Sequence, residues 1–314
     1  YRQFASDEVP GVAVTLEARI DGRAPVRLTR SSDREGYVRF DLGLDPVWPL
    51  PAQTSWETVR LAWLNRDGPQ TVDGFVLAPA HGAPLAVISD IDDTIVETGA
   101  GDLVRNWRRV AAQMPGERET VPGAVELYRH LGGGVLETSG VGDTIAATRR
   151  PFFYVSSSPW NLFDYLVAFQ KAKGLPQGPL LLRDWALDRA TFGSGSHGAH
   201  KSAAIGSLAA FYPALRFALI GDDTQADALA YAEAVAAHPG RIAGVFIRRA
   251  PGAGIDAREQ AALDTIVAAG VPLWSGASWD VGADFLDALG FTPGGETTRI
   301  VAAALEPAAQ AAMG

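Results

Sequence analysis

The chain has 314 residues, enough for two domains of ordinary size, and its 47% hydrophobic and 20% charged residues are typical of a globular protein. A net charge of −9 argues against sequence-independent nucleic-acid binding, which usually needs a basic surface. The absence of cysteine excludes disulfides, thiolate catalysis and cysteine-bound zinc. No uncharged apolar run reaches the roughly 18–20 residues of a membrane span and the N-terminus lacks a signal-peptide core, so we expect a cytoplasmic protein.

Residues 1–84 are predicted to form a small β-sandwich-like domain. Short runs of alternating apolar and polar residues are separated there by regularly spaced turn residues. The runs are residues 12–20, 24–30, 36–44, 58–64 and 71–78. We expect the aromatic residues of this segment to form its core rather than a ligand platform. They are Tyr37, Phe40, Trp48, Trp56, Trp63 and Phe75.

From residue 85 onward the pattern changes to strands that alternate with helices. The predicted strands are residues 85–90, 152–156, 179–182, 216–221, 242–247 and 271–275. The predicted helices are residues 122–131, 160–173, 200–212, 225–237, 257–269 and 281–289. This order indicates an α/β domain over residues 85–314, with a mostly parallel sheet covered by helices on both faces. Right-handed crossovers place all strand carboxyl ends on one side, where such folds bind ligands.

The first of these strands ends in two acidic residues, in the segment LAVISDIDDT. Side chains two positions apart on a strand point the same way, so Asp90 and Asp92 are expected to share one site. Two neighbouring carboxylates repel each other unless a cation lies between them or one is protonated. The alternative is an acidic turn after a buried strand, without a chemical role.

Two further strand ends carry polar side chains. The strand over residues 152–156 leads into three serines, of which Ser158 is predicted to cap a helix that begins at Pro159, leaving Ser156 to point into the site. The strand over residues 216–221 leads into Asp222, Asp223 and Asp227. Helix capping explains one acid there but not three.

A lysine near the predicted start of a helix is the last of these features. A cation at that end is unfavourable to the helix dipole, so Lys201 needs another reason for its position.

The motifs together resemble the haloacid dehalogenase-like phosphohydrolases, whose four signature motifs occur here in order. DIDDT resembles the DxDxT loop, Ser156 the hydroxyl after the second strand, Lys201 the lysine, and GDDTQAD the distal acidic motif. The longer segments VISDIDDTIVETG, PFFYVSSSPWNLFDYL, LLLRDW, HKSAAI and LIGDDTQAD resemble the phosphatidate phosphatase family first described from yeast actin patches. The resemblance implies a Rossmann-like parallel sheet that follows a smaller β-rich region.

The chemistry of phosphate-ester hydrolysis fits the same residues. Asp90 can attack phosphorus and form an aspartyl phosphate, while Asp92 gives a proton to the leaving alcohol and then takes one from water. Because the motifs lack the His and Cys ligands that zinc favours, we expect Mg²⁺. Its expected ligands are the Asp90 side chain, the Asp92 carbonyl and Asp222.

The remaining site residues are assigned to supporting roles. Ser156 can donate a hydrogen bond to a phosphoryl oxygen, Lys201 can neutralise the aspartyl phosphate, and Asp227 can position the ammonium group. The resemblance implies that Thr94, Ser157 and Arg183 contact the substrate. The family's distal motif usually reads GDSGQxD, so Asp223 adds a supporting charge beside the expected metal site.

Residues 97–150 contain little that could form a cap over the site. Residues 102–114 are predicted to form an amphipathic helix that packs on the domain with a solvated face. The alternative is a small cap whose Arg105, Arg108 and Arg109 touch lipid head groups while Trp107 enters the bilayer. An open site suits a bulky or membrane-embedded phosphate ester.

The favoured hypothesis is therefore a Mg²⁺-dependent phosphatase that acts on the lipid phosphatidate in peripheral contact with a membrane, without a nucleic-acid partner. A soluble sugar or nucleotide phosphate as substrate is the first alternative. A non-catalytic scaffold is the second, although the charged set Asp90, Asp92, Lys201 and Asp222 argues against it. The sequence has no GxxxxGK[ST] loop, which excludes a P-loop kinase.

Overall fold

The chain divides into two compact units in the computed structural model. One unit comprises residues 1–82 and 138–146, and the other comprises residues 83–137 and 147–314. The structure describes residues 9–19, 24–44, 47, 49–96, 116, 118–134, 146–183, 194–224, 226–250 and 254–291.

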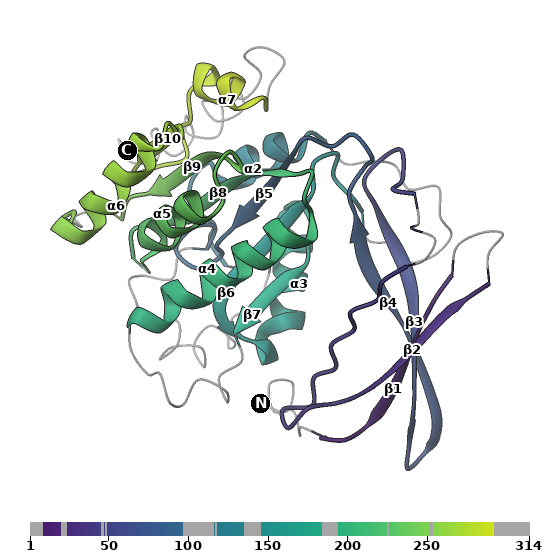
Figure 1. Ribbon diagram of the computed structural model, residues 1–314. Helices are drawn as coiled ribbons and strands as arrows, with labels where there is room; N and C mark the ends of the chain where they lie inside the picture. Colours follow the sequence, from purple (N-terminus) through teal and green to yellow (C-terminus); the bar gives the residue numbers. More distant parts are fainter. Residues whose placement is uncertain are drawn as a thin grey trace. The chain divides into compact units, whose positions relative to one another are not determined.

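The N-terminal unit contains a four-stranded antiparallel sheet with the strand order β2-β1-β3-β4 (Figure 1). The strands are β1 (Ala13–Ala18), β2 (Val26–Ser31), β3 (Ser55–Asn65) and β4 (Gly68–Ala78). Strands β3 and β4 form a long hairpin in which Asn65 pairs with Gly68 across a short turn. The prediction of a β-rich N-terminal region is thereby confirmed.

Two details of that prediction differ from the structure. Residues 36–44 were expected to form a strand, but the described backbone there pairs with no other strand. Instead, the Asp33 side chain accepts hydrogen bonds from the amides of Glu35 and Tyr37, which closes a turn at the start of the segment. The second difference is that the described residues of this unit form one sheet rather than the two of a sandwich.

The aromatic residues of this unit were expected to form its core, and the structure does not support this. Four of them are only partly buried, and Phe75 is 39% exposed. The four are Tyr37, Phe40, Trp56 and Trp63. Trp48 lies outside the described residues. A single sheet lacks the facing sheet that would cover aromatic side chains in a sandwich.

The second unit contains a six-stranded sheet with the order β10-β9-β8-β5-β6-β7, in which every neighbouring pair is parallel. Its strands are β5 (Leu85–Ser89), β6 (Phe152–Pro159), β7 (Leu180–Arg183), β8 (Arg216–Asp222), β9 (Ile242–Arg248) and β10 (Leu273–Gly276). The prediction of an α/β fold with a parallel sheet is confirmed. Strands β5 and β9 are buried along their whole length, which explains their nearly continuous apolar sequences.

The described part of this unit also contains six α-helices and one short 3₁₀ helix. They are α2 (Ala124–Gly132), η3 (Trp160–Leu162), α3 (Phe163–Lys173), α4 (Ser194–Phe211), α5 (Asp227–Ala237), α6 (Ala257–Ala268) and α7 (Ala283–Leu289). Helix α5 packs between α4 and α6 (Figure 1). No helix in the described part of the chain is long and apolar enough to cross a membrane.

The strand order places a topological switch point beside β5. From β5 the chain continues to β6 and β7 on one side, and it then returns to β8 on the other side of β5. The amide of Asp90 donates to the carbonyl of Ile220 at 2.8 Å, so the two strands stay paired up to their carboxyl ends. Doubly wound folds bind ligands in the crevice at such a point.

Candidate active site

The loop after β5 is a tight turn that buries its polar side chains. The amides of Ile95 and Val96 both donate to the Ile91 carbonyl, and Asp93 has a left-handed backbone with φ of 56°. Asp90, Asp92 and Thr94 are exposed by only 1%, 3% and 0%. Buried acids of this kind need charge or hydrogen-bond partners, because burial strongly disfavours an isolated carboxylate.

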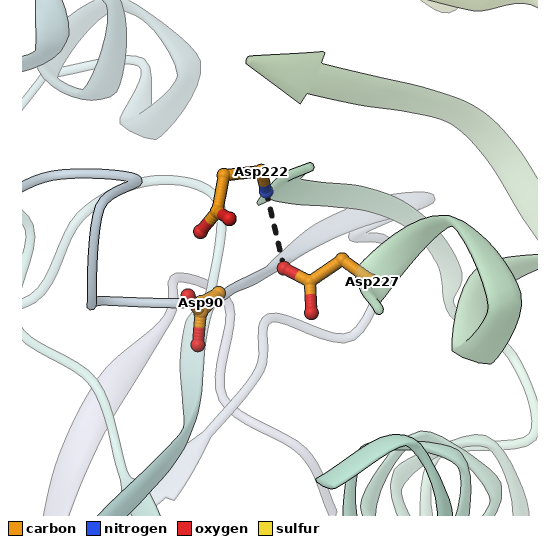
Figure 2. Close-up of side chains that lie close together, drawn as sticks. All are labelled: Asp90, Asp222 and Asp227. Carbon is orange, nitrogen blue, oxygen red and sulfur yellow. Dashed lines mark hydrogen bonds between the residues drawn. The ribbon is translucent and has the colours of Figure 1, made fainter. Parts of the chain in front are cut away.

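Three carboxylates, two at the ends of strands and one at the start of a helix, form one cluster (Figure 2). Asp90 follows β5, Asp222 ends β8 and Asp227 begins α5, and one oxygen of each lies within 4.8 Å of the others. The Asp222 amide donates to Asp227 Oδ2 at 3.1 Å. A Cβ at Gly221 would overlap the Asp227 carboxylate, so the close approach of α5 to β8 requires glycine there. The sequence expectation that Asp90 and Asp222 lie close together agrees with this geometry.

Lys201 is the cation of the cluster. Its Nζ lies 3.0 Å from Asp90 Oδ1 and also contacts Asp227 Oδ1, and the residue is 1% exposed. Burial alone would lower the pKa of Lys201, but the charges of Asp227 and Asp90 outweigh burial and raise it. Helix α4 begins at Ser194 rather than at the predicted residue 200, so Lys201 lies inside the helix. The predicted conflict with the helix dipole is therefore wrong, and the two ion pairs account for the lysine.

The cluster carries more negative than positive charge when it is fully ionised. Its three carboxylates face one ammonium group, which leaves two negative charges uncompensated. Burial raises the pKa of Asp90 well above its usual value. Burial, and to a lesser extent the charge of Asp227, raise the pKa of Asp222 to about 7. A divalent cation would remove this excess charge.

The donor atoms of the cluster fit a hard divalent cation. All three are carboxylate oxygens, which suit Mg²⁺, Mn²⁺ or Ca²⁺ better than zinc. Asp90 Oδ1 is buried and accepts no hydrogen bond from any described residue, although Lys201 approaches it as an ion pair. The site is therefore compatible with the metal that the sequence predicted.

Two threonines fix the orientation of Asp222. The Thr94 hydroxyl lies 3.0 Å from Asp222 Oδ2 and 3.3 Å from Asp90 Oδ2, while Thr224 donates to Asp222 Oδ1 through its amide and its hydroxyl. Thr94 was predicted to contact substrate, and the structure places its hydroxyl between two carboxylates. Thr224 stands at a position where the family's usual motif has glycine, and sequence reasoning assigned it no role although this departure was a signal.

Asp92 is not one of the three clustered carboxylates and is hydrogen-bonded to the serines of β6. Its Oδ2 accepts hydrogen bonds from the hydroxyls of Ser156 at 2.9 Å and Ser158 at 3.1 Å. Burial raises the pKa of Asp92, whereas the hydrogen bonds from Ser156 and Ser158 oppose the shift. A raised pKa keeps a proton on a carboxylic acid at a higher pH, as a general acid requires.

The predicted helix cap at Ser158 is wrong. Strand β6 continues through Pro159, and η3 begins at Trp160 without a side-chain cap. The Ser158 hydroxyl is directed to Asp92 instead, because the buried carboxylate offers a stronger acceptor than the backbone.

Asp223 lies outside the acidic cluster although it adjoins Asp222. Its Oδ1 accepts the Ala250 amide at 2.8 Å, and its Oδ2 lies 3.5 Å from Arg249 Nε. Asp223, the extra acid of the GDDTQAD motif, therefore binds the segment that follows β9 through Ala250 and Arg249.

Of the other residues predicted to contact the substrate or a membrane, the structure describes the side chain of Ser157 only. Ser157 is buried in β6 between the two serines that bind Asp92. The side chain of Arg183 lies outside the described part of the chain, as do residues 102–114 with Arg105, Trp107, Arg108 and Arg109.

Two residues that sequence reasoning missed bind the backbone of the loop after β5. Arg248 Nη1 donates to the Asp93 carbonyl at 2.7 Å, and Trp279 Nε1 donates to the Thr94 carbonyl at 2.9 Å. They are 155 and 185 residues away from their partners, so no local motif indicates either contact.

These features define a doubly wound α/β protein with a buried acidic site and one lysine at the switch point of its sheet. Residues 85–249 match the family model described as "Phosphatidate phosphatase APP1, catalytic domain". The match spans more than half of the chain, and the chain belongs to this family. The family resemblance predicted from the sequence is confirmed.

Two relatives each match about half of the chain. "Phosphatidate phosphatase APP1" of Saccharomyces cerevisiae is 29% identical over 165 residues, which are 52% of this chain and 26% of the yeast protein. "Uncharacterized protein C29B5.04c" of Schizosaccharomyces pombe is 28% identical over 171 residues, which are 52% of this chain and 25% of that protein. The matched region thus spans about a quarter of each relative's length.

Proposed function

We propose that this protein is a Mg²⁺-dependent phosphatase that converts phosphatidate to diacylglycerol and inorganic phosphate, with residues 85–314 as a haloacid dehalogenase-like catalytic domain. The main support for this proposal is the buried cluster of Asp90, Asp222 and Asp227 around Lys201 at the switch point of the sheet. Family membership supports the same activity, since the family is described by its phosphatidate phosphatase catalytic domain.

The metal would be held by the Asp90 and Asp222 side chains and by the Asp92 backbone carbonyl. When bound, it neutralises negative charge on the carboxylates and on the phosphoryl oxygens. Asp227 belongs to the same cluster, but its two oxygens already accept Lys201 Nζ and the Asp222 amide. These contacts support Asp227 as the residue that positions the lysine rather than as a metal ligand.

The first chemical step is transfer of the phosphoryl group to Asp90. A carboxylate oxygen of Asp90 attacks phosphorus in line, a new P–O bond forms, and the bond from phosphorus to the ester oxygen breaks. Asp92 gives its proton to that oxygen, and diacylglycerol leaves as a neutral alcohol. The raised pKa of Asp92 supports this role, since burial retains the proton until it is needed.

The second step releases phosphate from Asp90. Asp92, now ionised, takes a proton from water, and the water oxygen attacks phosphorus. The bond between phosphorus and the Asp90 oxygen breaks, which regenerates the Asp90 carboxylate and gives inorganic phosphate. Asp92 is protonated again at the end of the cycle.

The neighbouring polar residues stabilise this chemistry. Lys201 offsets charge on the aspartyl phosphate through its contact with Asp90. Ser156 would exchange its hydrogen bond to Asp92 for one to a phosphoryl oxygen, while Ser158 keeps Asp92 in place. Ser157 and Arg183 are proposed substrate contacts, and Asp223 is proposed as a supporting residue. The buried Thr94 hydroxyl is hydrogen-bonded to Asp222 and Asp90, so Thr94 is proposed to orient these two carboxylates rather than to contact the substrate.

Phosphatidate as substrate is supported by the names of the family and of the yeast relative, both of which include it. Peripheral membrane contact is proposed from the sequence alone. Arg105, Arg108 and Arg109 would add attraction to an anionic surface of about 1 kcal/mol each, which is weak and reduced by salt.

Phosphate release from a matched panel of esters tests the proposal. The panel comprises vesicles that contain phosphatidate, glycerol 3-phosphate and a nucleoside monophosphate, each with Mg²⁺ or with EDTA. We expect the highest kcat/KM for phosphatidate, loss of activity in EDTA, and a lipid activity that falls with added salt. A preference for a soluble ester, unaffected by salt, would overturn the lipid assignment. Turnover in EDTA at the full rate would overturn the metal assignment.

A further inference from the structure

The turn that carries Asp90, Asp92 and Thr94 is held by a tryptophan from the far end of the catalytic unit. Trp279 is completely buried, and its indole N–H donates to the Thr94 carbonyl at 2.9 Å. It lies after β10, beyond the residues 85–249 that match the family model.

None of the described amides within the turn donates a hydrogen bond to the Thr94 carbonyl. Its internal bonds join the amides of Ile95 and Val96 to the Ile91 carbonyl, and the Asp93 amide to the Val96 carbonyl. These bonds leave the Thr94 carbonyl to Trp279. The left-handed backbone at Asp93 is unfavourable for a residue with a side chain, so contacts from outside the turn must hold it.

The position of Thr94 bears directly on the acidic cluster. Its hydroxyl lies between Asp222 Oδ2 and Asp90 Oδ2, at 3.0 and 3.3 Å. A rotation of the Thr94 peptide would move this hydroxyl and remove one of the contacts that orient each carboxylate. The indole therefore fixes a hydroxyl that in turn orients two expected metal ligands.

Trp279 is itself fixed by the edge of the sheet. Its ring stacks on Trp274 of β10, with centroids 5.3 Å apart and planes inclined by 24°. The Arg249 amide donates to the Gly276 carbonyl, which ties this segment to the end of β9. The indole thus reaches the turn from a rigid support.

We propose that Trp279 is a positioning residue for the metal site, acting through the Thr94 carbonyl. The proposal deepens the proposed function and rests on its metal assignment. Hydrogen-bond partners of metal ligands commonly change metal affinity by about 10- to 100-fold when they are removed. Trp279 acts on the metal ligands through one additional hydrogen bond, so we expect its removal to change the affinity by an amount at the lower end of that range.

Matched substitutions at the two stacked tryptophans test the proposal. Trp279→Phe keeps an aromatic ring but removes the N–H. Trp274→Phe makes the same chemical change in an indole that donates to no described residue, and it keeps an aromatic ring stacked on Trp279. Mg²⁺ binding to the full chain is measured by calorimetric titration without substrate. The melting temperature without Mg²⁺ reports folding separately, and the kcat and KM for phosphate release are measured in parallel.

We expect Trp279→Phe to weaken Mg²⁺ binding by about 10-fold and to lower kcat with little change in KM, while Trp274→Phe binds Mg²⁺ like the wild type. Unchanged binding in both variants, or equal weakening in both, would overturn the role of Trp279 and leave the metal assignment intact. If the wild type does not bind Mg²⁺, the metal assignment fails and the inference fails with it.

Discussion

Replacement of Lys201 by methionine removes the only described cation of the acidic cluster and keeps most of the side-chain volume. In the wild type, Lys201 Nζ lies 3.0 Å from Asp90 Oδ1 and also contacts Asp227. At that distance and an effective dielectric constant of about 20, one such contact has a Coulomb energy of about 5 kcal/mol. Measured losses for breaking a buried ion pair are about 3–5 kcal/mol, so we expect Lys201→Met to lower the free energy of unfolding by that amount.

The loss should depend on pH in a defined direction. Asp90 already has a folded-state pKa above its usual value of 3.8, chiefly because of burial, and Lys201 opposes that shift. Without the ammonium group the folded-state pKa of Asp90 rises further. An acid with a raised folded pKa costs no stability below its unfolded pKa and costs more as pH rises toward the folded value. The variant should therefore be least destabilised below about pH 4.

Urea denaturation of the metal-free protein across this pH range measures the effect. Lys171→Met, at an exposed lysine of α3, is the matched control and should change stability by less than about 0.5 kcal/mol. Equal stability of Lys201→Met and the wild type at neutral pH would refute the view that Lys201 compensates the buried carboxylates. A loss that is the same at all pH values would refute the electrostatic explanation.

Three further predictions concern the chemistry and the packing of the site. Asp92→Asn should lower kcat by about 10²-fold or more, since the amide cannot transfer a proton; a near-normal kcat in steady-state assays would contradict its role. Burial raises the pKa of Asp222 to about 7, so this acid opposes folding increasingly from about pH 4 to about pH 7 in metal-free protein. Because Mg²⁺ binds the ionised form, the increase in melting temperature caused by Mg²⁺ should be larger at about pH 8 than at about pH 5, and equal increases would contradict this. Gly221→Ala should lower the urea midpoint, because its Cβ overlaps the Asp227 carboxylate, and a wild-type midpoint would show that α5 can shift.

The strands and helices of the catalytic unit could be predicted from sequence, because the central strands β5, β6, β8 and β9 are almost fully buried and contain apolar runs that alternate with helical segments. Parallel strands bring their carboxyl ends to one edge, so the proximity of Asp90 and Asp222 followed from the order of elements alone. The alternation of apolar and polar residues predicted strands less reliably in the N-terminal unit. The run over residues 36–44 has the pattern of a strand but pairs with no other strand in the described backbone.

Details of the site depended on contacts that the sequence does not encode locally. Ser158 has the sequence context of a helix cap, but its hydroxyl binds a carboxylate 66 residues away. Asp223 adjoins a cluster residue, but its side chain turns to Ala250. Trp279 donates to a backbone carbonyl, and a carbonyl leaves no signature in residue type.

The central claim is that Asp90 carries the phosphoryl group during turnover. Acid quenching of the protein during hydrolysis of phosphatidate with a radiolabelled phosphate group, followed by peptide mapping, tests it most directly. We expect label on the peptide that contains Asp90, release of that label by hydroxylamine as for an acyl phosphate, and neither label nor turnover in Asp90→Asn. Turnover by Asp90→Asn at a near-normal rate, or label on a different residue, would contradict the account.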